Sequence, residues 1–253
     1  MTRTDEAPAV ITADQVDVVL SGVPIVRHAD LSIPQGQAVA LTGNNGSGKT
    51  TLLRALLGLV PHRGQIRLFG TELRRFRAWR RIGFVPQRST ILVQQATVRE
   101  VVASGRLGLR HPFWPAGADD RRAVARALDE VHLADRAQSS FVHLSGGQQQ
   151  RALIARALAG EADLMVWDEP LAGVDRATQE VLAGVVRELK RQGRTVVMVL
   201  HESGPLEPLI DRTIVLADGR IVADGRIGGT TAGGHEVHEL PRSDVHHTGL
   251  EVG

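Results

Sequence analysis

The residues best suited to chemistry lie between positions 43 and 50, where the sequence follows the spacing G-x-x-x-x-G-K-T. In such a loop, successive backbone N–H groups surround phosphate oxygens. Lys49 would reach the terminal phosphates of a nucleotide, and the Thr50 hydroxyl would hold Mg²⁺. Lysine occurs only at positions 49 and 190 among 30 lysine and arginine residues, so its retention at position 49 favours a need for a compact ammonium group. The segment therefore predicts phosphate binding.

Two adjacent carboxylates end a hydrophobic run that begins at Leu164, as expected for a buried strand that delivers Asp168 and Glu169 to the edge of a sheet. Asp168 would bind Mg²⁺ directly or through water. Glu169 is the candidate general base that polarises an attacking water. The competing interpretation is an acidic helix N-terminus beside Pro170, and the presence of the phosphate loop favours the catalytic one. Trp167 is interpreted as core packing.

A second candidate anion-binding segment lies at residues 144–151, which read L-S-G-G-Q-Q-Q-R. Ser145 is a natural N-cap for a helix predicted over Gln148 to Ala159, and the two glycines leave backbone N–H groups uncovered. The positive end of a helix binds phosphate readily. The chain therefore has two phosphate-binding devices, although a single nucleotide needs only one.

These groups must be positioned by a sheet with helices on its faces. A buried strand from Gln37 to Thr42 leads into the phosphate loop, and a helix over residues 51–60 follows it until Pro61. Hydrophobic runs at 164–169 and 195–201 alternate with helical segments, which indicates a mainly parallel sheet. Further strands are predicted at residues 10–20 and 25–34, as a short pair at 65–70 and 81–86, and in a hairpin over 213–225 that turns at Asp218-Gly219.

The expected fold class is therefore α/β, with a P-loop NTPase core, an N-terminal antiparallel β subdomain and an inserted α-helical subdomain. We expect one domain over residues 10–228, with the helical subdomain at about 88–141. Residues 229–253 are rich in glycine and polar residues and are predicted to form a flexible tail. Its histidines could bind metal transiently or simply be solvated: His235, His238, His246 and His247.

Composition excludes several classes of protein. A hydrophobic content of 42% suits a globular core, and no run is long enough to span a membrane. The N-terminus lacks the apolar stretch of a signal peptide, which favours the cytoplasm. Cysteine is absent, so disulfides and thiolate metal sites are excluded. A net charge of +2 and 3% aromatic residues argue against nucleic acid as a partner.

Five segments occur in the order found in ATP-binding cassette (ABC) ATPases: residues 43–51, Gln87, 144–151, the W-D-E-P of 167–170, and His201. Over nearly all of residues 10–226 the chain resembles the nucleotide-binding subunit of an ABC transporter. The resemblance implies that Gln87 contacts Mg²⁺ and the attacking water, and that His201 contacts the γ-phosphate. It implies catalytic roles for Glu169, His201 and Gln87, with Mg²⁺ held by Thr50, Gln87 and Asp168.

The same resemblance implies which residues bind ATP, and that the site is shared between two subunits. The implied ATP-binding residues are Gly43, Asn44, Asn45, Gly46, Ser47, Gly48, Lys49, Thr50, Thr51, Ser145, Gly146, Gly147, Gln148 and Asp175. In this family Ser145, Gly146 and Gly147 bind the γ-phosphate of ATP held by the other subunit, and Asp175 ends a loop that crosses the interface. The second phosphate device is thereby explained. We expect a head-to-tail homodimer that is inert as a monomer.

The chain departs from the family at Leu20, where an aromatic residue usually stacks on adenine. Base selectivity is therefore open. The implied partners are integral membrane permease subunits and, indirectly, a substrate-binding protein, which places the chain at the cytoplasmic face of the cell membrane. Cargo is selected by those subunits.

Three segments resemble the branch that imports zinc or manganese: I-G-F-V-P-Q-R-S, T-V-R-E-V-V-A-S-G-R-L-G-L-R and P-L-A-G-V-D. The alternative within transporters is an importer of iron chelates or cobalamin. A soluble ABC ATPase of translation or DNA repair is a further alternative, although such proteins tend to carry two cassettes or a long coiled coil. The L-S-G-G-Q-Q-Q-R segment argues against a P-loop kinase or GTPase.

Overall fold

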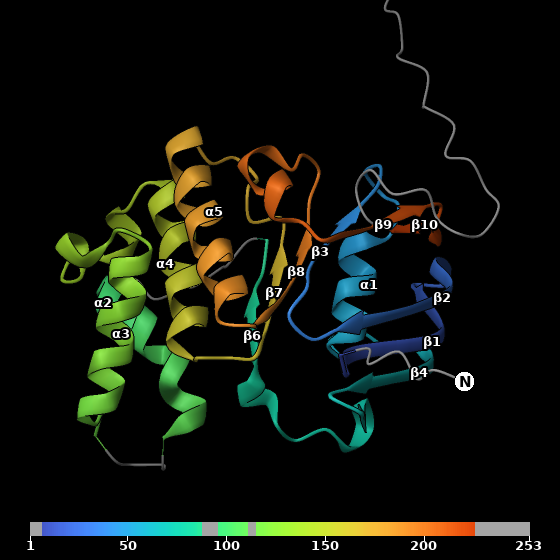
Figure 1. Ribbon diagram of the computed structural model, residues 1–253, viewed down its shortest axis with the longest axis horizontal. Helices are drawn as coiled ribbons and strands as arrows, with labels where there is room; N and C mark the ends of the chain where they lie inside the picture. The colour runs from blue at the N-terminus through green and yellow to red at the C-terminus, as the bar shows by residue number, and fades with distance from the viewer. Residues whose placement is uncertain (1–6, 88–95, 111–114, 226–253) are drawn as a thin grey trace, which may run out of the picture.

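Two β-sheets organise the protein in a computed structural model that describes residues 7–87, 96–110 and 115–225 (Figure 1). The larger sheet has six strands in the order β10-β9-β3-β8-β7-β6, and all neighbours except β9 and β10 are parallel. Its strands are β3 (Ala38–Thr42), β6 (Ile82–Val85), β7 (Leu164–Asp168), β8 (Thr195–Val199), β9 (Arg212–Ala217) and β10 (Arg220–Gly225). The predicted parallel core is confirmed.

The smaller sheet is antiparallel and has the order β2-β1-β4-β5. Its strands are β1 (Ala9–Leu20), β2 (Val23–Pro34), β4 (Arg63–Leu68) and β5 (Thr71–Glu72). Helix α1 (Lys49–Leu56) lies between the two sheets and buries Leu52, Leu53 and Leu56 in a core that both sheets share (Figure 1). The predicted pairing of 65–70 with 81–86 is wrong, because β4 pairs with β1 and β5 while β6 pairs with β7.

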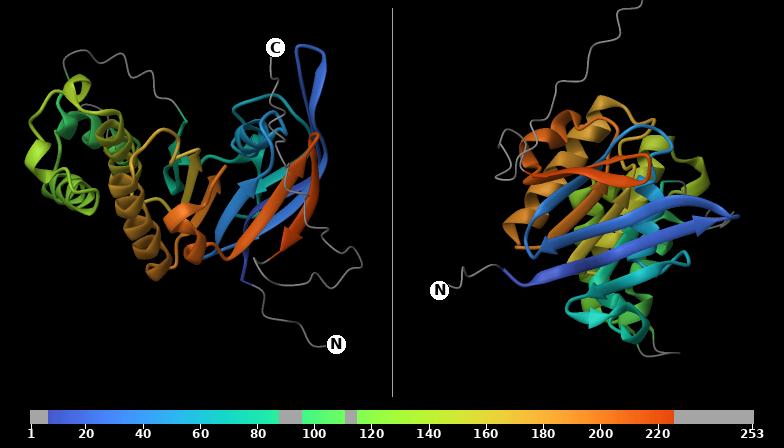
Figure 2. Two further views of the ribbon diagram at one scale, coloured as in Figure 1. Left: turned by 90° about the horizontal axis from the view of Figure 1, so that it is seen from above. Right: turned by 90° about the vertical axis from the view of Figure 1, so that its right-hand side faces the viewer.

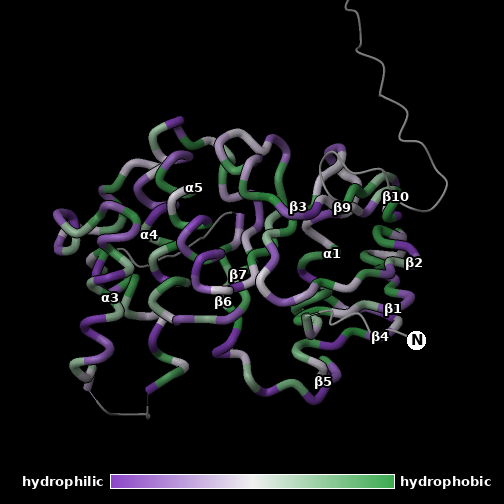
Figure 3. Tube along the Cα trace, viewed as in Figure 1, coloured by the Kyte–Doolittle hydropathy of each residue, from purple (hydrophilic) through white to green (hydrophobic). Residues whose placement is uncertain are grey.

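Helices α4 (Gly146–Ala159) and α5 (Arg176–Arg191) cover the other face of the large sheet, and α2 (Val98–Ala103) and α3 (Ala118–Glu130) pack against α4 on the side away from the sheet. Figure 2 shows that α2 and α3 (green) lie at the far end of the protein from the β1–β2 hairpin (blue). Hydrophobic and hydrophilic residues intersperse along α3 and α5 in Figure 3, as expected for helices that bury one face. None of the helices within the described ranges is long and apolar enough to cross a membrane.

Helix α1 is shorter than predicted, because a glycine rather than Pro61 ends it. Gly58 adopts a left-handed conformation with φ of 67°. Its N–H donates to the Ala55 carbonyl at 2.9 Å, and the Leu59 N–H donates to the Arg54 carbonyl at 2.9 Å. This pair of bonds is the usual way in which a left-handed glycine closes a helix. The prediction overlooked this signal in L-L-G-L.

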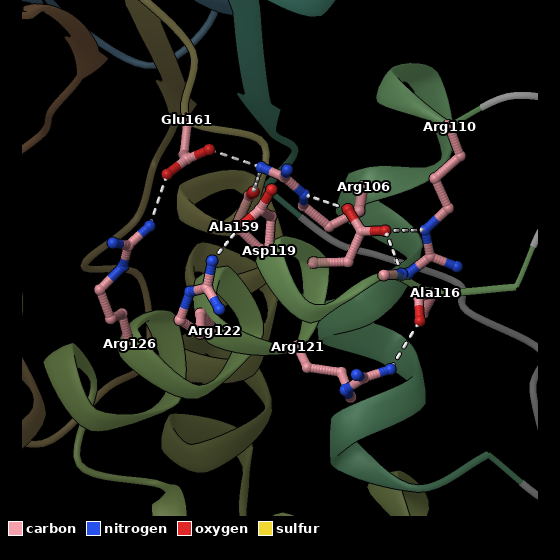
Figure 4. Close-up of polar contacts among 11 residues, drawn as sticks. Arg106, Arg110, Ala116, Asp119, Arg121, Arg122, Arg126, Ala159 and Glu161 are labelled. Atoms are coloured by element: carbon pink, nitrogen blue, oxygen red, sulfur yellow. Dashed lines mark hydrogen bonds and ion pairs between the residues drawn. The ribbon is translucent and has the colours of Figure 1, made fainter.

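A buried arginine forms hydrogen bonds that connect η3 and α3 to the end of α4 (Figure 4). Arg106 is 7% exposed and lies in the 3₁₀ helix η3 (Ser104–Leu109). Its guanidinium contacts Asp120 at 2.9 Å, the Ala159 carbonyl at 3.0 Å and Glu161 at 2.6 Å. The hydrogen bond from Arg106 holds the pKa of Asp120 below its usual range. The network joins η3, α3 and the segment after α4.

We expect Arg106→Met to lower the free energy of unfolding by about 2 kcal/mol, because it removes the charged hydrogen bonds to Asp120 and Glu161 while Arg110 and Arg126 still pair with those carboxylates. Urea unfolding measures this. The loss should be present above pH 3.8, the ordinary pKa of Asp120, and should fade as the pH falls through the lower folded value, where Asp120 is protonated in both states.

The matched control is Arg122→Met, which removes an exposed pair with Asp119 on the same helix as Asp120. It should change the free energy of unfolding by no more than about 0.5 kcal/mol. Equal losses in the two variants would contradict the assignment of Arg106 as the buried fastener.

Candidate functional site

The glycine-rich loop joins the carboxyl end of β3 to the start of α1. Three of its glycines have positive φ: Gly43 at 138°, Gly46 at 80° and Gly48 at 100°. A Cβ at Gly43 would lie 2.0 Å from the Leu216 carbonyl oxygen, so only glycine fits there. Within the described ranges, the backbone N–H groups of Gly46, Gly48 and Lys49 have no protein acceptor. They line a hollow and are available to phosphate oxygens.

Lys49 lies within this loop with its side chain turned back over it. The residue is 5% exposed, and Nζ donates to the carbonyls of Gly43 and Asn44 at 2.8 Å each. Burial lowers the pKa of Lys49, and the nearby Glu169 carboxylate partly opposes that effect. A compact ammonium group meets both carbonyls of the loop, and its contact with the terminal phosphates stays a prediction.

The carboxyl end of β7 brings Asp168 against the start of α1. Asp168 is 0% exposed, and burial raises its pKa. The Thr50 hydroxyl donates to Asp168 Oδ1 at 2.7 Å. Asp168 Oδ2 has no hydrogen-bond partner and lies 3.6 Å from the Arg54 guanidinium. Arg54 was missed by the sequence reasoning, although its spacing of four residues from Thr50 places both on one helix face.

Glu169 is the point at which three distant segments meet. It has a φ of 52°, which is strained for a residue with a Cβ. His201 Nε2 lies 2.9 Å from its Oε1, and Gln87 Nε2 donates to its Oε2. Gln87 follows β6 and His201 follows β8, the strands on either side of β7. Lys49, Thr50, Glu169 and His201 line one hollow, at the sheet edge where α/β proteins bind ligands.

Residues 145–148 form the start of α4. None of them is among the described residues that line the hollow at Lys49. Ser145 caps α4 as predicted: its Oγ accepts from the Gln148 N–H at 3.3 Å, and Gln148 Oε1 accepts from the Ser145 N–H at 3.0 Å. Asp175 caps α5 by accepting from the Thr178 N–H at 2.7 Å, a bond that lowers the pKa of Asp175. A Cβ on Gly147 would lie 2.8 Å from Thr178 Oγ1, so the two helix starts pack closely.

The oxygens at the loop and at β7 suit a hard divalent cation. The Thr50 hydroxyl and the unpartnered Asp168 Oδ2 are the ligand types that Mg²⁺ prefers. Among residues 7–87, 96–110 and 115–225, no three His, Asp or Glu side chains gather into a metal-binding cluster. The tail histidines His235, His238, His246 and His247 lie outside the described residues.

The fold is that of a P-loop nucleoside triphosphatase. Its marks are the glycine-rich loop after β3, the order of the parallel strands, and the carboxylates Asp168 and Glu169 at the end of β7, two strands from β3. The sequence profile of the family described as ABC transporter matches residues 26–172, which is more than half of the chain. The chain therefore belongs to the ABC transporter family and contains its ATP-hydrolysing domain.

Relatives and solved structures agree with this assignment. The chain is 35% identical to the zinc transport system ATP-binding protein TroB of Treponema pallidum, over 86% of this chain and 81% of that protein. It is 38% identical to the manganese transport system ATP-binding protein MntB of Bacillus subtilis, over 81% and 82%. An inward-facing structure of a putative metal-chelate type ABC transporter is similar with a TM-score of 0.74 and 28% identity, over 86% and 83%.

A solved ATP-binding cassette, dimeric in a post-hydrolysis state with ADP and phosphate bound, is similar with a TM-score of 0.76 and 26% identity. The likeness covers 87% of this chain and all of that one. ATP-binding cassettes of this family thus bind adenine nucleotides and form dimers.

Proposed function

We propose that this chain is the ATP-hydrolysing subunit of an importer for zinc or manganese ions, with residues 10–228 as the ATPase domain and 88–141 as its helical subdomain. The observation that carries the catalytic part is the convergence of Gln87 and His201 on the Glu169 carboxylate beside the phosphate loop. The metal cargo is supported by the relatives, which include zinc, manganese and general metal transport systems.

The arrangement assigns a task to each side chain. Backbone N–H groups of residues 43–51 and the Lys49 ammonium would hold the phosphates. Thr50, Asp168 and Gln87 would hold Mg²⁺, which when bound neutralises phosphate charge. Glu169 would accept a hydrogen bond from the attacking water and draw its proton away as the water adds to the γ-phosphorus. His201 would orient Glu169 and contact the γ-phosphate.

We propose further that ATP is enclosed only when two subunits associate head to tail. Ser145, Gly146, Gly147 and Gln148 lie outside the hollow at Lys49, so in one subunit they have no phosphate to bind. The N–H groups of Gly146 and Gly147, which the Ser145–Gln148 capping box does not use, would meet the γ-phosphate held by the partner. Asp175 belongs to this same surface through the packing of Gly147 against Thr178.

A groove lies at the amino ends of β6 and β7, whereas the nucleotide site lies at the carboxyl ends of the strands. This groove fits a cytoplasmic segment of a membrane permease. It is lined by Trp79, which is 44% exposed, by Leu109, which is 37% exposed, and by Arg80 and Arg156. No carboxylate lines it within the described ranges, and burial alone, with no charged or hydrogen-bonding partner among those residues, lowers the pKa of Arg156. Apolar and acidic side chains on the permease segment would complement it. The chain would then sit at the cytoplasmic membrane face, and a substrate-binding protein would act on it only through the permease.

We expect Arg156→Glu to abolish copurification with the permease subunit of the transporter, because it replaces attraction for an acidic segment by repulsion. The control Arg187→Glu reverses an exposed charge on α5 and should copurify normally. Retention of the permease by Arg156→Glu at the wild-type level would exclude this groove as the docking site.

Cargo is tested by reconstituting the complex with that permease in vesicles and measuring ATP-dependent uptake. Zinc or manganese uptake is the expected result. A hemin import ATP-binding protein of Jannaschia is also 36% identical, over 85% of this chain, so hemin is included as the competing cargo. Uptake of hemin without zinc or manganese would overturn the proposed cargo while leaving the ATPase assignment intact.

A further inference from the structure

An arginine-rich segment leads into β6 at the end of the protein away from the nucleotide site. Residues 74–81 read R-R-F-R-A-W-R-R and pass through the 3₁₀ helices η1 (Leu73–Arg75) and η2 (Trp79–Arg81). Figure 1 shows this segment (teal) at the lower end of the view, beneath β6. Arginine supplies five of the eight residues, with no aspartate or glutamate among them. The segment therefore concentrates positive charge beside the amino ends of the parallel strands.

Protein carboxylates neutralise one of these five arginines. Arg81 pairs with Asp163 at 2.5 Å, and its guanidinium carbon lies 3.7 Å from the centroid of the Phe69 ring. The other four arginines form no ion pair with any residue that the structure describes. They are all exposed: Arg74, Arg75, Arg77 and Arg80. Clustered cations whose charge the protein does not compensate attract an anionic surface.

Two of the four arginines line a hollow together with an exposed tryptophan. Arg77 and Arg80 border this hollow with Trp79, which is 44% exposed. The Arg77 guanidinium donates to the carbonyls of Arg74 and Phe76 at 3.1 and 2.9 Å, which fixes its position. The Trp79 ring packs edge-on against Phe76 with 5.0 Å between ring centroids, so its orientation is also fixed. Tryptophan is enriched at the headgroup level of membranes, where one end of its ring is apolar and the other is polar.

The neighbouring 3₁₀ helix η3 adds exposed aliphatic side chains. Gly108 lines the same hollow, and its neighbours Leu107 and Leu109 are 64% and 37% exposed. Leu109 belongs to the groove proposed for the permease, whereas Leu107 does not line it. Basic side chains beside tryptophan and leucine are the composition by which proteins bind an anionic membrane surface. We call the four unpaired arginines, Trp79 and Leu107 the basic rim.

The place of the basic rim beside the groove favours lipid over nucleic acid as its partner. Trp79 and Arg80 line both the hollow and the groove. A permease segment that docks in the groove comes from the bilayer, so docking would bring the rim close to the lipid surface. Proteins that bind single-stranded nucleic acid stack successive bases on several rings, and the rim has one.

We propose that the basic rim binds the phosphate groups of anionic lipids on the cytoplasmic surface of the membrane that holds the permease. This inference rests on the proposed function and adds a membrane contact that does not pass through the permease. Guanidinium groups donate paired hydrogen bonds to phosphate oxygens. The Trp79 ring and Leu107 would enter the headgroup region beside them. A subunit already held at the surface meets the permease at a higher effective concentration, so the two contacts reinforce each other.

Cosedimentation of the full-length chain with lipid vesicles tests this proposal. Vesicles of phosphatidylglycerol and phosphatidylcholine in equal parts should bind the chain at least about 30-fold more tightly than vesicles of phosphatidylcholine alone, because each arginine near an anionic surface adds about five-fold. Binding should fall steeply between about 0.1 M and about 0.5 M NaCl, since the arginines are exposed and their charges are screened. Excess inorganic phosphate should displace little of the chain, because it offers one phosphate where the vesicle offers many. Equal binding to the two kinds of vesicle would overturn the proposal.

Two triple variants with the same loss of charge separate the rim from the net charge of the chain. The rim variant carries three substitutions outside the groove: Arg74→Gln, Arg75→Gln and Arg77→Gln. It should weaken binding to the phosphatidylglycerol vesicles about 30- to 100-fold. The control variant changes exposed arginines of β2, α5 and β10: Arg27→Gln, Arg187→Gln and Arg220→Gln. It should weaken binding less than about three-fold, and equal losses in the two variants would overturn the assignment to the rim.

The other possible partners of the rim give distinct results. A single-stranded oligonucleotide that displaces the wild-type chain from the vesicles, and binds the rim variant much more weakly, would assign the rim to nucleic acid and overturn the proposal. Loss of the permease from the rim variant during copurification in lipid-free detergent would assign the rim to the permease, with the same consequence.

Failure of this inference is separable from failure of the proposed function. A wild-type chain that ignores anionic vesicles, yet hydrolyses ATP and copurifies with the permease, rejects the rim and leaves the transporter role in place. A chain that binds the vesicles through the rim but neither hydrolyses ATP nor copurifies with a permease supports the lipid contact and rejects the proposed function.

Discussion

Glu169→Gln should reduce ATP turnover by about 10²- to 10⁴-fold while leaving ATP affinity nearly unchanged. The substitution keeps the size and hydrogen-bonding capacity of the side chain but removes the carboxylate that His201 and Gln87 hold. The phosphates are held by the loop and Lys49, which the change does not touch. Because hydrolysis is what separates the subunits in the proposed cycle, ATP should then trap a dimer. Phosphate release and size-exclusion chromatography with and without ATP measure both effects.

Glu202→Gln is the matched control. Glu202 is an exposed carboxylate that directly follows His201 and does not line the hollow at Lys49. It should retain wild-type turnover.

Removal of Mg²⁺ with EDTA should abolish turnover in the wild-type chain and release the trapped Glu169→Gln dimer, because Thr50 and Asp168 would lose the cation that links them to the phosphates. Wild-type turnover in Glu169→Gln would remove the general-base role assigned here.

Ser145→Arg should abolish turnover by at least about 10²-fold and leave ATP affinity of the subunit intact. The start of α4 does not line the hollow at Lys49 among the described residues, so binding within one subunit should not require it. A bulky side chain there would block approach of the γ-phosphate from the partner. Turnover and calorimetric binding of a non-hydrolysable ATP analogue separate the two effects. Loss of affinity together with turnover would mean that Ser145 acts within its own subunit.

Loss of the N-cap is an alternative reason for inactivity, because arginine cannot replace the hydrogen bond from the Gln148 N–H. Such a loss costs about 1 kcal/mol of stability. Ser145→Asp keeps the cap and places a negative charge against the phosphate, so it should be as stable as the wild type and still inactive. An active Ser145→Asp variant would assign the defect of Ser145→Arg to folding.

Mixing two inactive variants adds a direct test of the shared site. A dimer of Ser145→Arg with Lys49→Ala would have both lesions in one composite site and none in the other. About a quarter of wild-type activity per subunit should return, since half of randomly formed dimers are mixed and each has one intact site of two. Two sites complete within single subunits predict no recovery.

The sequence alone determined the chemistry-bearing segments, since each depends on local spacing. The loop at 43–50, the helix cap at Ser145 and the hairpin turn at Asp218-Gly219 are short patterns whose backbone requirements can be seen in neighbouring residues. The structure reproduces them, with positive φ at Gly43, Gly46 and Gly48, a capping box at Ser145, and positive φ at Asp218 and Gly219. The parallel core was predictable for a similar reason, because buried strands and helices alternate along the chain.

Only the tertiary structure decided which distant groups meet. Gln87 and His201 are 82 and 32 residues from Glu169, and they converge because β7 is placed between β6 and β8. That order depends on long-range pairing, which hydrophobic periodicity does not encode, and the wrong pairing of residues 65–70 with 81–86 has the same origin. The packing of Gly147 against Thr178 likewise arises from a contact between elements that no local pattern specifies.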